Sequence, residues 1–119
     1  MLSEKSDIRK NFKTDVFERD KYSCRVCGHV YGQERAESNL DAHHITDRKE
    51  MPNGGYVKEN GISLCKNPIN PNLQSCHLRA EKFHISGGEK WEPGLHPDDL
   101  YKIIGSTKEL AIQASEKLK

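Results

Sequence analysis

Apolar residues near the N-terminus recur at a helical interval. Ile8, Phe12 and Val16 follow one another every four positions, and Phe17 widens the same stripe. This spacing puts the four side chains on one face of a helix and leaves the charged residues between them on the other faces. The pattern therefore predicts a helix over residues 8–22 that packs through its apolar face.

The middle of the chain changes to the shorter period of β-strands. Residues 40–45 alternate between the two faces of a strand, and residues 61–65 form a second short run. The segment between them is expected to be a long loop, because residues 52–55 (Pro-Asn-Gly-Gly) are a strong turn signal. Residues 31–39 are polar and are also expected to form a loop.

Helices are expected after the second strand and in the tail. Ser75 is a suitable N-cap for a helix from residue 76 to about residue 83. Pro97 fits the first position of another helix, which Gly105 would end. The two strands and the first of these helices together form a ββα unit.

The end of the chain is expected to cover the core. Residues 106–109 (Ser-Thr-Lys-Glu) have the pattern of a capping box that opens a last helix. In that helix Leu110, Ala114 and Leu118 are spaced by four positions. We expect this stripe and Trp91 to pack on the core rather than to bind a cofactor.

The chain is long enough for one small domain with a thin core. It has 119 residues, of which 34% are hydrophobic and 31% are charged. Chains this short and polar often need a metal ion or a disulfide to hold their fold. We expect a single domain over residues 1–119, with a core at about 12–84 and a helical extension at about 86–119.

Composition also bounds the location and the partners of the chain. The first ten residues lack the apolar stretch of a signal peptide, and no apolar run approaches the ~20 residues of a membrane span. A cytoplasmic location without membrane contact is therefore expected, where paired cysteines bind metal more often than they form disulfides. The formal net charge is only +1, so a surface for nucleic acid would have to gather its basic residues on one face.

Four cysteines form two pairs around the predicted ββα unit. Cys24 and Cys27 have the two-residue spacing of a zinc knuckle, while Cys65 ends the second strand and Cys76 begins the helix. Four thiolates in a tetrahedral array are the typical ligands of structural Zn²⁺. Other interpretations remain open: four unpaired thiols, a disulfide framework, or a site in which His29 replaces one cysteine.

Adjacent histidines stand between the two cysteine pairs. His43 and His44 lie in the first predicted strand, and His77 directly follows the last cysteine. Neighbouring residues of a strand point to opposite faces, so one histidine can bind a metal ion while the other addresses a water molecule. A neutral imidazole with a pKa near ~6.5 can remove a proton from water at physiological pH. The arrangement suits a closed cysteine site that holds the fold and a histidine site that performs chemistry.

These motifs resemble those of the HNH endonuclease family. The resemblance rests on residues 41–45 (Asp-Ala-His-His-Ile), on Asn60 shortly before the third cysteine, and on the Cys-His pair at 76–77. Residues 16–28 are similar to the segment that leads into the knuckle in the zinc-containing members. The resemblance covers about residues 12–84.

The resemblance implies both a fold and an activity. The fold would be α+β, with a small ββα-metal core (a His-Me finger), a four-cysteine zinc site and flanking helices. The activity would be metal-dependent hydrolysis of phosphodiester bonds in DNA, double-stranded in the first instance. His43 and His77 would be ligands of the catalytic ion and His44 the general base. Asn60 would complete the catalytic set by bracing the hairpin loop.

The chain departs from the family pattern at one ligand position. Many members have another histidine four residues after the one that His77 matches, where this chain has Glu81. Positions four apart share a helix face, so Glu81 is a further candidate ligand. Oxygen ligands would favour Mg²⁺ or Mn²⁺, and imidazole ligands Ni²⁺ or Zn²⁺. His84 could approach this site or a phosphate, although His84, His29 and His96 also suit ordinary surface or capping positions.

Basic residues on three predicted segments are candidates for phosphate contacts. They are Lys10, Lys13, Arg48, Lys49, Arg79 and Lys82. A zinc-stabilised DNA-binding module without catalysis, a subunit of a larger nuclease complex and an enzyme acting on RNA remain alternatives, as do a monomer and a dimer. Phage, homing and restriction enzymes use this fold, so a bacterial or phage origin is expected without a choice of biological role.

Overall fold

The centre of the fold is a two-stranded antiparallel sheet. The computed structural model describes residues 3–67 and 72–118, in which β1 (Leu40–His44) pairs with β2 (Gly61–Cys65). Both predicted strands are confirmed, the first of them one residue shorter than expected. Together with the helices around it, the sheet gives the predicted α+β class.

Helix α1 (Ser3–Arg19) packs against the sheet where His44 pairs with Gly61. A Cβ atom built on Gly61 would lie 2.5 Å from Val16 Cγ2 and 2.7 Å from Phe12 Cε1. Real Cβ atoms do not approach other atoms so closely, so this position needs glycine because the helix comes so near to the strand.

The helix predicted over residues 8–22 is confirmed, but neither of its boundaries is, because it already begins at Ser3. The helix ends at Arg19, and Lys21 and Tyr22 have φ values of 55° and 57°. These left-handed residues turn the chain toward the first cysteine pair. Non-glycine residues adopt this conformation uncommonly, and apolar spacing gives no sign of it.

The segment at 31–39 contains a helix, α2 (Gln33–Asn39), where a loop was predicted. Ala36 is its one buried residue. The Asn39 side-chain amide donates to the Arg35 carbonyl at 2.8 Å. The loop prediction was wrong because a short helix with a single buried position leaves no apolar period in the sequence.

The long connection between the strands is built from three short 3₁₀ turns. They are η1 (Arg48–Glu50), η2 (Pro52–Gly55) and η3 (Lys58–Asn60). The predicted turn is confirmed within η2, where Asn53 has a φ of 52°. These turns give the connection a fixed shape and place its side chains beside the sheet.

Two helices after the sheet begin at predicted residues, and the second also ends where it was predicted to end. Helix α3 (Cys76–Ile85) follows Ser75, whose hydroxyl caps an amide of the first turn at 3.2 Å. It extends two residues beyond its expected end. Helix α4 (Pro97–Ile104) ends at Gly105, which has a φ of 70°.

Among the residues that the structure describes, no helix is both long enough and apolar enough to cross a membrane.

The last helix, α5 (Lys108–Glu116), begins at a different cap from the one expected. The Thr107 hydroxyl accepts a hydrogen bond from the Leu110 amide at 3.1 Å. The Ser106 hydroxyl instead donates to the Glu59 carbonyl at 3.0 Å. The predicted capping box at Ser106 was therefore wrong, because a distant carbonyl engages that hydroxyl.

The buried face of α5 also differs from the expected stripe. Ala111 and Ser115 are fully buried, whereas Leu110 is 49% exposed. The helix packs against η2 and η3, and the Asn53 side chain donates to the Ser115 carbonyl at 3.0 Å. Only small side chains fit such a close contact. Trp91 was likewise expected on the core but is 45% exposed.

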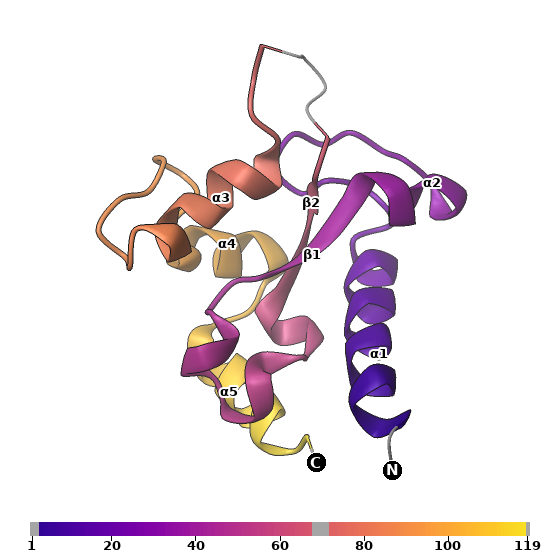
Figure 1. The fold of residues 1–119 in the computed structure, drawn as a ribbon, viewed down its shortest axis with the longest axis vertical. Coiled ribbons are helices and arrows are strands. Elements are labelled where there is room, and N and C mark those ends of the chain that lie inside the picture. The colour runs from indigo at the N-terminus through magenta and orange to yellow at the C-terminus, as the bar shows by residue number, and fades with distance from the viewer. Residues whose placement is uncertain (1–2, 68–71, 119) are drawn as a thin grey trace.

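Helix α1 and the α3–α4 pair lie on opposite sides of the sheet (Figure 1). Helix α5 lies beside the 3₁₀ turns near the end of the molecule where both termini emerge. The core fills the space between these layers. Its largest fully buried apolar residues are Val16, Leu40, Ile45, Ile62, Leu64 and Leu100.

A buried carboxylate that no motif reveals ties these layers together. Asp20 accepts hydrogen bonds from Arg19 at 2.8 and 2.9 Å and from Arg25 at 2.7 Å. It also accepts one from the Ser63 amide of β2 at 2.8 Å. Burial alone would raise the pKa of Asp20, but these hydrogen bonds together outweigh it and hold the pKa below its usual value. Arg25 extends the network to the Ile103 carbonyl of α4 at 2.8 Å.

Replacing Asp20 by asparagine should destabilise the fold by about 3 kcal/mol at neutral pH, the lower end of the range for breaking a buried ion pair. The lower end applies because both arginines are partly exposed. Since the folded-state pKa is depressed, the carboxylate stabilises the fold fully above its unfolded pKa of about 3.9. That stabilisation is lost as the pH falls through the folded-state value, so the gap between the two proteins should close in acid.

Urea unfolding of both proteins between pH 7 and pH 3 measures this gap. Asp15→Asn, at an exposed position of α1, is the matched control and should change little. An Asp20→Asn protein as stable as its parent at pH 7 would contradict the structural role of this carboxylate.

Candidate metal centres

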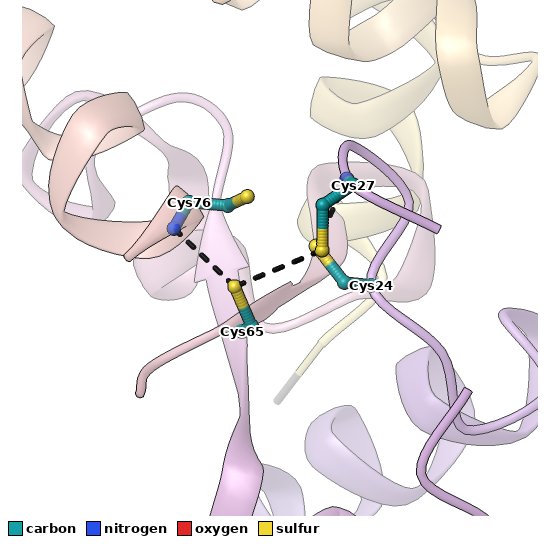
Figure 2. A group of neighbouring side chains, drawn as sticks. All are labelled: Cys24, Cys27, Cys65 and Cys76. Carbon is teal, nitrogen blue, oxygen red and sulfur yellow. Dashed lines mark hydrogen bonds between the residues drawn. The ribbon is translucent and has the colours of Figure 1, made fainter. Parts of the chain in front are cut away.

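The four cysteines come together from three separate segments (Figure 2). Cys24 and Cys27 lie on the turns after α1, Cys65 ends β2, and Cys76 begins α3. Their sulfur atoms all lie within 4.8 Å of one another, and none forms a disulfide. The predicted convergence of the two pairs is confirmed, and all four cysteines are free rather than joined in disulfides.

The spacing of the sulfurs suits a tetrahedral metal ion. The Cys27 and Cys65 sulfurs are 4.0 Å apart. A tetrahedron with Zn–S bonds of ~2.3 Å has sulfurs about 3.8 Å apart. The four cysteines could therefore hold one metal ion with little movement.

Nearby donors favour the thiolate form that metal binding requires. The Cys27 amide donates to the Cys24 sulfur and the Cys76 amide to the Cys65 sulfur, both at 3.4 Å. The hydrogen bond from Cys76 lowers the pKa of Cys24 to about 4, whereas the same contact raises the pKa of Cys76 and burial raises that of Cys27, so Cys24 is the thiolate that these contacts favour. Arg79 adds a positive charge, because its guanidinium lies 3.8 Å from the Cys76 sulfur. His29 lies outside this cluster, at an exposed position against Tyr31.

The adjacent histidines of β1 contact opposite sides of the fold. The His43 ring lies 5.2 Å from that of His77 and 5.3 Å from that of His84, both on α3. The His44 ring lies 4.7 Å from Phe12 of α1 and 4.8 Å from Tyr56 between η2 and η3. The alternation of a strand thus gives the two imidazoles different neighbours, as the sequence predicts.

A second group of potential ligands lies between β1 and α3. His43, His77 and Glu81 each offer one ligand atom, and these three atoms lie within 4.8 Å of one another. His77 and Glu81 are one helical turn apart, and His77 Nε2 lies 3.6 Å from a Glu81 oxygen. The structure therefore brings together the three residues that sequence reasoning assigned to one metal ion.

Asp41 contributes a contact to which sequence reasoning assigned no role. Its carboxylate lies 2.8 Å from His77 Nδ1, so it accepts a hydrogen bond from that nitrogen. This contact fixes the ring and turns Nε2 toward Glu81. Metal-binding histidines commonly have such a carboxylate behind them. The sequence signal was the acidic residue two positions before His43 on the same strand.

The charges of this group also suit a cation. Burial lowers the pKa of His43 well below its usual value and keeps the ring neutral. Burial would lower the pKa of His77 too, but hydrogen bonds with Asp41 and Glu81 outweigh it and raise the pKa to about 9. The protonated ring thus occupies a position that attracts positive charge. His43 Nδ1 is buried and has no hydrogen-bond partner among the described residues, which suits a ligand atom.

His44 lines an open pocket of about 450 Å³ together with the second group. Burial, reinforced by the charge of Arg48, lowers the pKa of His44 to about 4. The ring is therefore neutral at physiological pH, and the same burial makes it a weaker base than a free imidazole. Its Nε2 is buried, and it has no hydrogen-bond partner within the part of the chain that the structure describes.

Asn60 lies behind the pocket and holds its main chain in place. Its side chain is fully buried and accepts a hydrogen bond from the Thr46 amide at 3.0 Å. It donates to the carbonyls of Thr46 and Gly55 at 3.1 and 3.2 Å, and the Tyr101 hydroxyl donates to it at 2.7 Å. Asn60 therefore links the segment just after β1 to η2, as a residue that braces the hairpin loop would.

His84 belongs to the site rather than to the surface. Its ring stacks on His43, and its Nε2 lies 2.9 Å from the His44 carbonyl. Sequence reasoning left its role open, although its position seven residues after His77 on α3 was a usable signal. His96, by contrast, caps α4, because its Nδ1 accepts a hydrogen bond from the Asp98 amide at 3.0 Å.

The six basic residues that were predicted to contact phosphate lie in different surroundings. Arg48 lines the pocket. Lys13 pairs with Glu37 at 2.7 Å, and Arg79 pairs with Glu92. The remaining three are exposed and do not line the pocket: Lys10, Lys49 and Lys82.

Comparison with known proteins gives no match for the chain: no family model, no curated protein and no solved structure matches it.

Proposed function

We propose that the chain is a metal-dependent endonuclease that hydrolyses phosphodiester bonds in DNA, with a ββα-metal core of the HNH type. One observation carries this proposal. His43 belongs to a group of potential ligands, while the adjacent His44 lines the pocket as a neutral ring. A DNA-binding module without catalysis has no use for such a pair.

The residues divide the chemistry between them. His43, His77 and Glu81 would hold a divalent ion, which neutralises charge on the phosphate and on the leaving oxygen when it is bound. His44 would take the proton from the attacking water, since its ring is neutral and lines the pocket. Asp41 orients His77, and Asn60 keeps the end of β1 in position.

The ligand types narrow the choice of ions. Two imidazoles and one carboxylate suit Zn²⁺, Ni²⁺ or Mn²⁺, and water ligands would also allow Mg²⁺. The four cysteines would hold Zn²⁺, because a closed set of thiolates leaves no position for substrate. The cysteine site is therefore structural in this proposal, and the histidine site is catalytic.

The basic residues favour a second candidate, a nuclease subunit that shares DNA binding with a partner. The net charge is +1, and acidic neighbours neutralise Lys13 and Arg79. A partner could then supply further phosphate contacts.

Incubation with supercoiled plasmid tests the proposed function. Zinc-loaded protein, freed of other ions, is assayed with Mg²⁺, Mn²⁺, Ni²⁺ and Zn²⁺ in turn, and nicked and linear products are separated on a gel. We expect cleavage with at least one ion, and His29→Ala should cut as the parent does. A parent protein that binds DNA but cuts it with none of the four ions would favour the non-catalytic module.

His43→Ala and His77→Ala should both lose cleavage in a manner that depends on metal concentration. Each removes one ligand, so a higher concentration of the catalytic ion should restore part of the rate. Titration of that ion against the initial cleavage rate gives an apparent affinity for each variant. An apparent affinity equal to the parent's in either variant would remove that histidine from the ligand set.

A further inference from the structure

The six arginines of the chain fall into two groups by their partners. Three of them form ion pairs, Arg19 and Arg25 with Asp20 and Arg79 with Glu92. The other three have no ion pair with any described residue: Arg9, Arg35 and Arg48. Arg35 lies over the Tyr31 ring near the cysteine knuckle.

Arg9 and Arg48 come from distant parts of the sequence and meet at one tyrosine. The Arg9 guanidinium lies 5.6 Å from the centre of the Tyr56 ring. The Arg48 guanidinium donates to the Tyr56 hydroxyl at 3.4 Å. Both arginines are exposed, so each keeps donors free for a ligand.

This group lies beside His44, on the side away from the candidate ligands. The Tyr56 ring stands edge-on to His44 at 4.8 Å, and Arg48 and Tyr56 line the same pocket as His77 and Glu81. A phosphate at His77 and Glu81 would therefore have a neighbour along its strand near the two arginines.

The acidic residues of the pocket do not cancel this charge by direct contact. The Asp47 side chain accepts a hydrogen bond from the Lys49 amide at 3.4 Å, and Asp41 and Glu81 both lie against His77. None of the three forms an ion pair with Arg9 or Arg48. A planar guanidinium binds two phosphate oxygens at once, which makes two converging arginines well suited to a phosphodiester.

We infer that Arg9, Tyr56 and Arg48 form a binding site for the phosphate that adjoins the scissile one on the cut strand. The inference rests on the proposed function for the identity of the ligand and assigns roles to Arg9 and Tyr56. Tyr56 holds the site together: its ring supports Arg9, and its hydroxyl fixes Arg48. The two arginines would thereby set how the strand crosses His44.

Binding measured without cleavage tests the site. Zinc-loaded full-length protein in a buffer without free divalent ions is titrated into a fluorescently labelled DNA duplex, and anisotropy is followed at several salt concentrations. Arg9→Ala and Arg48→Ala should each weaken binding roughly tenfold at low salt, the effect of one lost charged hydrogen bond. Each should also reduce the slope of log K against log salt by about 0.9.

Two further variants separate this site from general charge. Arg35→Ala removes an arginine that also stacks on a tyrosine and should leave affinity and slope unchanged. Tyr56→Phe keeps the ring beneath Arg9 but loses the hydroxyl that holds Arg48, so it should weaken binding less than either arginine variant does. All four are exposed or half-buried positions, and circular dichroism checks that each variant is folded.

The outcomes separate a failure of the phosphate site from a failure of the proposed nuclease activity. Reduced affinity and slope in both arginine variants, with no change in Arg35→Ala, support the site even if the parent cuts DNA with no metal. In that case the proposed function fails and the phosphate site stands. The site is overturned if both variants bind as the parent does, if Arg35→Ala loses as much affinity, or if the parent does not bind the duplex.

Discussion

Replacing His44 by alanine should reduce DNA cleavage by roughly 10²–10⁴-fold, the usual contribution of a positioned general base. The variant should keep its zinc and most of its affinity for DNA, because His44 belongs to neither group of potential ligands. Excess catalytic ion should not restore the rate. Single-turnover cleavage of a labelled duplex, measured beside zinc content and DNA binding, gives all three results.

The structure adds a control that the sequence does not suggest. His44 packs against Phe12, a core residue, so alanine leaves a cavity there and costs some stability. Imidazole added to the assay should occupy that cavity and restore part of the rate if the ring acts as a base. A variant that cuts at the parent rate would instead exclude His44 as the base.

Replacing Cys27 by serine should remove most of the free energy that a structural metal gives to folding, on the order of 10 kcal/mol in small zinc domains. Small domains are stable by about 5–15 kcal/mol in total, so the variant should be largely unfolded at room temperature. Cys27 is the most informative cysteine to replace, because it is exposed and the other three are buried. A surface substitution that affects packing alone changes stability by about 0.5 kcal/mol or less.

Metal content and thermal unfolding measure this effect directly. The parent should contain one tightly bound Zn²⁺ and should lose its folded structure when a strong chelator removes it. Cys27→His keeps a metal ligand and should retain both zinc and much of the stability. If Cys27→Ser melts at the parent temperature, the four cysteines do not hold a metal that matters for folding.

Local signals predict much of the fold. Strand β2 has the predicted bounds, and Ser75 and Gly105 stand at the helix ends where their backbone preferences place them. Contacts between distant segments account for the errors. The Ser106 hydroxyl is engaged by Glu59, and α5 buries small residues because the 3₁₀ turns approach it closely. Neither contact leaves a periodic trace in the sequence.

The residues of the candidate site also divide into those that the sequence reveals and those that only the structure reveals. His43, His44 and the four cysteines stand in short motifs, so sequence spacing is enough to select them. Asp41 and His84 act through contacts with other histidines, and Arg9 meets Tyr56 across 47 positions of the sequence. Such partners are fixed by packing, which spacing alone does not encode.

The peptide bond between Cys76 and His77 joins the two candidate centres. The first residue of α3 belongs to the cysteine group and the second to the histidine group. A newly made chain would therefore have to acquire its zinc before α3 could present His77 to the catalytic ion. Under the proposed function, a chain that lacks the ion of its cysteine group would therefore also lack a correctly placed His77 and would not cleave DNA.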